Sequence, residues 1–152
     1  MTDLLLFLHI LLFVFSFAFT AGISILLGRV AGKADPAIIH AAFRAARPLS
    51  MAGGIGWVLT ALVGAALAGA FQLPMNAPWL LGSYVAAAIL ILTGFLVHSP
   101  WQARVIAASA SPGPQPTPQL EALLRSPAHR IASGVSAACV LAIVYLMVAR
   151  PG

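Results

Sequence analysis

The sequence predicts an all-α membrane protein, a four-transmembrane-helix bundle whose helices run up-down-up-down. The 152-residue chain is 61% hydrophobic and only 7% charged, whereas a soluble domain carries about 25% charged residues. So few charged side chains cannot coat a soluble globule of this size, and disordered chains are poor in hydrophobic residues. The apolar residues also gather in four runs, each long enough to cross a hydrocarbon core of about 30 Å.

The first apolar run, residues 4–27, predicts a transmembrane helix that is retained in the protein. A cleaved signal peptide is the alternative, and it would carry basic residues before a shorter apolar core. The three residues before the run include no basic one, and the run continues past Gly22. We therefore expect this segment to stay in the membrane.

The second span is predicted at residues 49–71, and a helical segment at residues 35–47 precedes it. Pro48 separates the two, because proline removes a hydrogen bond from a helix interior. Two placements of residues 35–47 are open: a cytoplasmic extension of the second span, kinked at Pro48, or a short interfacial helix.

The third and fourth spans are predicted at residues 78–98 and 127–148. The fourth has a clear start, because Ser126 can cap a helix and Pro127 fits its first position. Between these spans, residues 111–119 carry a proline at every even position from 112 to 118. Such a segment is expected to be an extended, poorly ordered cytoplasmic loop. The whole chain is thus one membrane domain.

The basic residues predict how the bundle is oriented. Cytoplasmic connections of membrane proteins accumulate Lys and Arg, and only Arg150 lies on the opposite side. We therefore expect both termini outside. The net charge of +5 follows from this orientation, so no nucleic-acid partner is expected. The other seven basic residues all lie on or beside the two connections that share one side: Arg29, Lys33, Arg44, Arg47, Arg104, Arg125 and Arg130.

Small and polar residues mark the helix faces that are expected to pack inside the bundle. The second span carries Gly56, Thr60 and Gly64 at intervals of four residues, on one face. This small face can serve a helix of another subunit as well as an internal one. Most Ser and Thr side chains in the spans are expected to bond the backbone one turn earlier, as is common in membrane helices.

His98 and His129 form one candidate cofactor site. No Asp or Glu lies inside a span, so the four histidines are nearly the only ionisable groups at membrane depth. His98 ends the third span and His129 begins the fourth, at similar depth on inner faces. Two facing imidazoles can bind a b-type haem, and helix bundles hold such sites. The alternative is a pair of interfacial residues beside lipid headgroups.

His40 and His9 are the other two candidates. A bare metal site normally needs three or four ligands, and His40 can supply a third only if residues 35–47 fold back toward the pair. His9 lies in the first span, roughly 9 Å below its outer end. We expect Gly64 opposite His9, which leaves room for a flat macrocycle or for ordinary packing. His9 is therefore either a ligand or a hydrogen-bonding core residue.

The sequence gives little sign of an enzyme. Proton relays and cation paths in membranes usually need buried carboxylates, and none is present in the spans. The sequence also lacks a phosphate-binding loop, an HExxH motif and a Ser-His-Asp set with a buried acid.

The opening of the chain resembles a bacterial group of membrane proteins. The resemblance rests on the run Leu5-Leu6-Phe7-Leu8-His9-Ile10-Leu11-Leu12, the small pair Ala21-Gly22 and the basic connection that follows. This group includes the DUF2269 membrane proteins, the copper resistance D domain and the HemJ protoporphyrinogen oxidases. In the HemJ group the histidine is implicated in haem binding, so the resemblance implies a ligand role for His9. Size and hairpin layout are most similar to the DUF2269 type.

Three functions are therefore carried forward. The first is a bundle that binds haem b or assists redox chemistry. The second is a non-catalytic subunit that packs in the bilayer with other membrane subunits or with copies of itself. The third is copper or other metal handling, although the Met-rich and Cys-rich motifs that Cu(I) favours are missing.

Overall fold

The computed structural model describes residues 2–32, 35–110 and 115–150. All the regular elements in these ranges are helices, which confirms the all-α class. Four stretches are long and apolar enough to cross a membrane: Thr2–Ala31, Pro36–Ala70, Pro78–Ala108 and Pro118–Ala149. The elements are α1 (Thr2–Phe17), η1 (Ala18–Gly22), α2 (Ile23–Ala31), α3 (Pro36–Ala70), α4 (Pro78–Thr93), η2 (Gly94–His98), α5 (Ser99–Ala108), α6 (Pro118–Leu124) and α7 (Pro127–Ala149), where η marks a π-helical turn.

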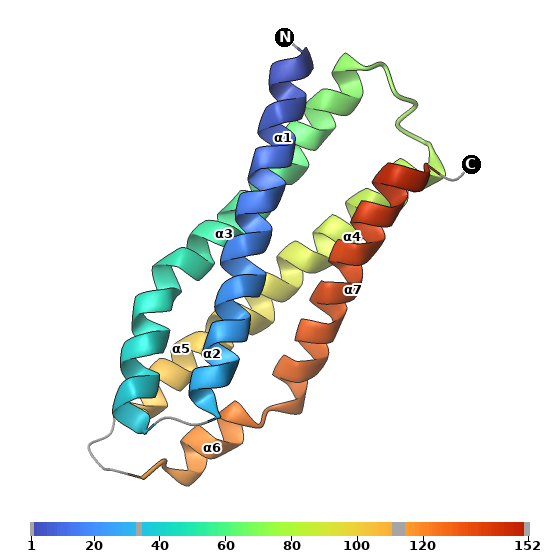
Figure 1. The fold of residues 1–152 in the computed structure, drawn as a ribbon. Helices are drawn as coiled ribbons and strands as arrows, with labels where there is room; N and C mark the ends of the chain where they lie inside the picture. The colour runs from blue at the N-terminus through green and yellow to red at the C-terminus, as the bar shows by residue number, and fades with distance from the viewer. Residues whose placement is uncertain (1, 33–34, 111–114, 151–152) are drawn as a thin grey trace.

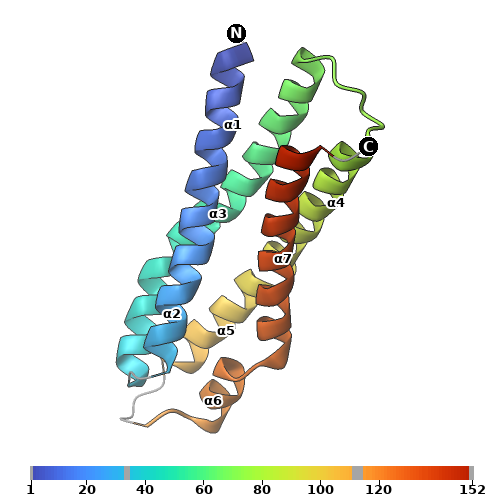
Figure 2. The same cartoon turned by 45° about the vertical axis from the view of Figure 1, so that its right-hand side comes forward.

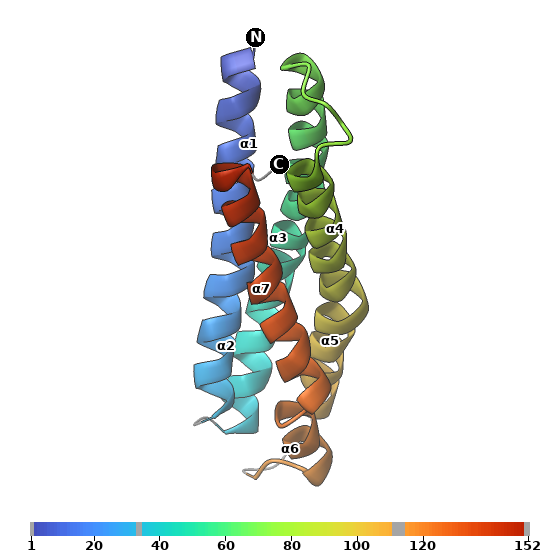
Figure 3. The same ribbon diagram turned by 90° about the vertical axis from the view of Figure 1, so that its right-hand side faces the viewer.

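The helices pack as two antiparallel hairpins (Figure 1). In the first hairpin α1, η1 and α2 pack against α3, and in the second α4 packs against α7. The start of α1 and the end of α7 lie toward the same end of the bundle, and α6 lies at the other end (Figures 1 and 2). In Figure 3 the second hairpin faces the viewer, and α7 lies in front of α3.

The first three stretches are longer than the hydrocarbon layer of a bilayer. They extend into a separate cluster of apolar side chains at the α6 end, which we call the second core. A helix of 30 residues, the length of the first stretch, is about 45 Å long, against a hydrocarbon core of about 30 Å. At the α6 end a cluster of buried apolar side chains joins α2, α3, α5 and α6: Leu27, Ile39, Phe43, Ala46, Val105 and Leu120.

Residues 35–47 are mostly part of α3, so the structure has the extension of the second span and not a separate interfacial helix. Asp35 caps the helix, because its side chain accepts a hydrogen bond of 2.9 Å from the Ile38 N–H. Pro48 lies inside the helix, where it cannot donate to the carbonyl of Arg44. The direction of α3 changes along its length (Figure 1). Ile39 and Phe43 hold the extension in the second core.

The structure has helix in two segments that lie between the predicted third and fourth spans. The third span was expected to end at His98, but the helix continues through η2 into α5 and ends at Ala108. The loop expected at residues 111–119 is shorter at its end, because Pro118 begins α6. Residues 111–114 of this loop lie outside the described residues. Lys33, in the first connection, lies outside them too. The start of α6 repeats the Ser126-Pro127 signal: Thr117 accepts a hydrogen bond of 3.2 Å from the Leu120 N–H, and Pro118 follows it.

The small face of the second span packs inside the chain, against α1. A Cβ atom on Gly56 would overlap Ser16 Oγ, and one on Gly53 would lie 2.9 Å from Thr20 Cγ2. This face therefore no longer supports a contact with another subunit. The expectation for the hydroxyl side chains is confirmed, because these bond the carbonyl four residues earlier: Ser16, Thr20, Ser24, Thr60, Ser83, Thr93 and Ser133.

Trp57 connects the two hairpins in the membrane-spanning part. Its ring is 6% exposed and packs with Leu90 of α4 and Ile143 of α7 in one cluster. Its indole N–H donates a hydrogen bond of 3.2 Å to Thr20 Oγ1, and its ring meets that of Phe13 edge-on at 5.3 Å. The polar and the apolar side of this one residue thus position α1 against the rest of the bundle.

Candidate functional site

The structure brings His98 and His129 together. His98 is the last residue of η2, and His129 is the third residue of α7. Their Nδ1 atoms are 3.2 Å apart, and the two rings are nearly perpendicular with centroids 5.0 Å apart. The cap of α7 fixes the backbone here, because the His129 N–H donates to Ser126 Oγ at 3.4 Å. Both histidines are half-buried.

Trp101 and Ser136 hold this pair in place. The Trp101 ring lies flat against that of His129, with centroids 3.5 Å apart and planes 7° apart. The Trp101 indole N–H donates to the Leu123 carbonyl at 2.8 Å, which anchors the ring to α6. Ser136 Oγ lies 3.3 Å from His98 Nε2. Sequence reasoning missed Trp101, although residues three apart share a helix face and the spacing from His98 was a usable signal.

In this arrangement the pair does not fit a haem. A macrocycle bound between the rings would have to separate two nitrogens that are only 3.2 Å apart. The facing atoms are Nδ1, which sits next to the ring carbon that carries the side chain, so a flat macrocycle there would collide with the residue's own stem. Trp101 also covers one face of the His129 ring.

A single metal ion fits the same pair better. Two nitrogens bound to one tetrahedral ion at 2.0–2.1 Å lie about 3.3 Å apart. The observed Nδ1–Nδ1 distance of 3.2 Å is close to that span. The same distance also suits a hydrogen bond in which one Nδ1 donates to the other. The donor atoms therefore suit a bare ion more than the iron of a porphyrin.

His40 does not join the pair. It lies on the part of α3 that precedes Pro48, where its Nδ1 is 3.0 Å from the Ile106 carbonyl oxygen and 3.3 Å from Ser109 Oγ. The described ranges contain no group of three or more His, Cys, Asp or Glu side chains that could hold a metal ion. The condition for a third ligand, that residues 35–47 fold back, is therefore not met.

His9 forms a separate polar site near the opposite end of the bundle. Its Nδ1 lies 3.0 Å from the Thr60 carbonyl oxygen. A carbonyl can only accept, so Nδ1 carries the proton and the neutral ring has Nε2 as an acceptor or ligand atom. Gly64 does lie against the ring, because a Cβ there would be 2.8 Å from His9 Cε1.

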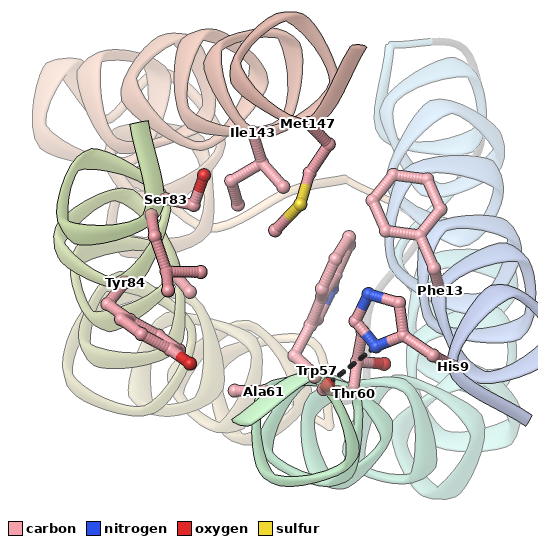
Figure 4. A pocket seen from close by; sticks show the side chains of 12 residues that line it. His9, Phe13, Trp57, Thr60, Ala61, Ser83, Tyr84, Ile143 and Met147 are labelled. Atoms are coloured by element: carbon pink, nitrogen blue, oxygen red, sulfur yellow. Dashed lines mark hydrogen bonds between the residues drawn. The ribbon is translucent and has the colours of Figure 1, made fainter. Parts of the chain in front are cut away.

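A cavity of about 50 Å³ lies beside His9. Figure 4 shows His9 and Tyr84 on opposite walls of this cavity. Its volume suits a few water molecules or one small group, so the space beside Gly64 does not fit the macrocycle considered from the sequence. The Tyr84 Oη atom is buried without a hydrogen-bond partner among the described residues. The lining residues come from α1, α3, α4 and α7: His9, Phe13, Trp57, Thr60, Ala61, Gly64, Leu80, Ser83, Tyr84, Ala87, Ile143 and Met147.

The comparisons with known proteins support the membrane assignment. No curated protein matches the chain, and no solved structure does either. They give no support to the resemblance to the copper resistance D and HemJ groups. A family model described as "Predicted integral membrane protein (DUF2269)" matches residues 3–151, which is nearly the whole chain. With four apolar helices long enough to cross a bilayer, the chain therefore belongs to the DUF2269 family of multi-pass integral membrane proteins.

Proposed function

We propose that this bundle binds a transition-metal ion through His98 and His129 and serves as a metal-binding, redox-accessory membrane protein. The observation that carries the proposal is the 3.2 Å approach of the two Nδ1 atoms. Imidazole is a ligand that copper, zinc, nickel and iron all accept. The Trp101 stack restricts rotation of the His129 ring. Ser136 Oγ makes the outer contact to His98 Nε2 that commonly orients a metal-bound histidine.

Two protein ligands leave part of the coordination sphere open. Structural zinc sites use four protein ligands, so this pair is not built as a permanent structural centre. Water or a donor from another molecule completes the shell, which favours an exchangeable ion. By the order of metal affinities, copper binds such nitrogen ligands more tightly than zinc.

Metal binding by the purified protein tests the proposal. The protein in detergent is titrated with Cu(II), with Cu(I) under reducing conditions and with Zn(II), and the metal retained after desalting is measured. We expect about one ion per chain in the wild type and a loss of binding in His98→Ala and His129→Ala. His40→Ala is the matched control, because His40 lies elsewhere at the same end of the bundle, and it should keep the ion. Retention below one ion in ten chains, or an equal loss in His40→Ala, contradicts the proposal.

Binding of haem b is tested with the same purified protein by a different measurement. The absorption spectrum is recorded after expression with sufficient haem. A Soret band that disappears in His98→Ala and His129→Ala would replace the bare ion with a haem and require that the pair separates. A Soret band that depends on His9 alone would favour a single-ligand site instead.

A second function, a non-catalytic subunit of a larger membrane complex, is favoured by the exposure of α1. Only Ser16 is buried along its 16 residues, and α1 packs mainly against α3. Its remaining surface is free for lipid or for a helix of another protein. A native gel of source membranes in mild detergent tests this function. A band at the mass of the 15.7 kDa chain in its micelle, without partners, contradicts it.

We further propose that the bundle lies in a bacterial inner membrane with its α6 end in the cytoplasm. Six arginines on or next to the two connections at that end support this orientation under the positive-inside rule. Reporter fusions test it: a periplasmic reporter after residue 150 should be active and one after residue 110 inactive. The reverse pattern contradicts the orientation.

A further inference from the structure

We propose that the cavity between His9 and Tyr84 holds the hydroxyl head of a neutral lipid-like molecule, with its tail in an apolar groove between α1 and α7. This site is separate from the histidine pair, and it does not depend on metal binding.

The polar atoms of the cavity, His9 Nε2 and Tyr84 Oη, can be paired by a ligand group that both donates and accepts hydrogen bonds. His9 Nε2 is an acceptor, because Nδ1 donates to Thr60. Tyr84 Oη is buried and has no partner in the described part of the chain, although buried hydroxyls are nearly always paired. A hydroxyl group can donate to Nε2 or accept from the Tyr84 O–H. A hydroxyl head can therefore pair with a polar atom on either of the two walls shown in Figure 4.

The lining excludes a charged head. No charged side chain is among the described residues that line the cavity, and an unpaired ion is costly to bury in an apolar medium. A phosphate or carboxylate head is therefore disfavoured. The volume of about 50 Å³ is smaller than the cavity of about 150 Å³ that holds benzene in another protein. The head is accordingly a small hydroxyl or hydroxymethyl group and not an aromatic ring.

An apolar groove of about 400 Å³ lies next to this cavity. Phe13 of α1 lines both spaces. On α7, Val140 and Val144 of the groove lie within one turn of Ile143 and Met147 of the cavity. The groove is lined only by apolar side chains of α1 and α7: Phe13, Phe17, Ala137, Val140, Leu141 and Val144. An amphiphile can therefore place its head beside His9 and its tail along the groove.

Photo-crosslinking with a hexadecanol that carries a diazirine in its chain tests the site. The full chain in lipid nanodiscs is irradiated with this probe, and the labelled peptides are identified by mass spectrometry. We expect labels on the α1 and α7 segments that line the groove. Unlabelled 1-hexadecanol should compete at least about tenfold better than hexadecane, which has no head group, and better than palmitate, which is charged.

Tyr84→Phe removes only the hydroxyl, and it should weaken competition by hexadecanol about fivefold, as expected for one lost neutral hydrogen bond. Tyr145→Phe is the matched control, because Tyr145 is 64% exposed on α7, and it should leave competition unchanged. If Tyr84→Phe does not elute as a folded protein, Gly64→Ala provides the test, since its methyl group would displace the His9 ring and should likewise weaken competition by hexadecanol. Equal competition by hexadecane and hexadecanol overturns the proposal. Competition by hexadecanol that the test variant, Tyr84→Phe or Gly64→Ala, leaves unchanged overturns it too.

Discussion

Gly56→Ala should destabilise the bundle by disturbing the contact between α1 and α3. The added methyl group would overlap Ser16 Oγ. Ser16 is completely buried, and its hydroxyl donates a hydrogen bond of 2.6 Å to the Leu12 carbonyl. The hydroxyl must therefore rotate away or the helices must separate.

The magnitude follows from two opposing effects. Loss of a buried hydroxyl's partner costs about 1–3 kcal/mol, whereas replacement of glycine by alanine in a helix gains up to about 1 kcal/mol. We expect Gly56→Ala to lower the free energy of unfolding by about 1–2 kcal/mol. Gly134→Ala is the matched control in α7, where a Cβ meets nothing within 4 Å, and it should be neutral or slightly stabilising.

A double-mutant cycle with Ser16→Ala tests the cause directly. Ser16→Ala removes the overlapping oxygen, so Gly56→Ala should cost little in that background, and the coupling energy should be about 1–2 kcal/mol. The free energy is measured by SDS-induced unfolding of the protein in mixed micelles, followed by circular dichroism. The reasoning is refuted if Gly56→Ala behaves like Gly134→Ala, or if Ser16→Ala does not restore stability.

Three further changes have expected results in the same unfolding assay. Trp57→Phe should cost about 1 kcal/mol through the lost bond to Thr20, in addition to the packing lost with the smaller ring. The cost should be about 1 kcal/mol smaller in a Thr20→Val background; additive costs would show that the bond does not matter. Leu120→Ala should cost about 2–5 kcal/mol, because Leu120 is completely buried in the second core, and hydrogen exchange of α6 should rise; unchanged exchange would mean that α6 does not depend on this contact. Pro48→Ala should stabilise α3, because an N–H at position 48 can bond the Arg44 carbonyl, and a loss of stability would show that the change of direction is required for packing.

Much of the fold was predictable because hydrophobic length and periodicity are local properties of the chain. The four apolar runs, the helix start at Ser126-Pro127 and the small face of the second span all follow from residue type and spacing. The helix ends were less predictable. Beyond about 20 residues a membrane helix no longer needs an apolar sequence, so the extensions depend on tertiary contacts such as those of Phe43 and Leu120.

The candidate site was predictable only in part. His98 and His129 were placed at similar depth from the sequence, since depth follows from position along a span. The role of Trp101 could not be obtained from depth, because it depends on how far α5 continues and how α6 folds beneath it. The unpaired Tyr84 hydroxyl likewise follows from the contacts of four helices around one cavity.

By itself, the sequence determined that this chain is a four-span helical membrane protein, because its solvent must be lipid and its apolar runs match the bilayer. It also marked which helix faces pack inside. Only the tertiary structure decided that His98 and His129 meet, that His40 stays apart, and that the space beside His9 is too small for a macrocycle. The reason is physical: the distance between two side chains depends on the rotation and separation of the helices that carry them, and close packing at positions such as Gly56 sets both.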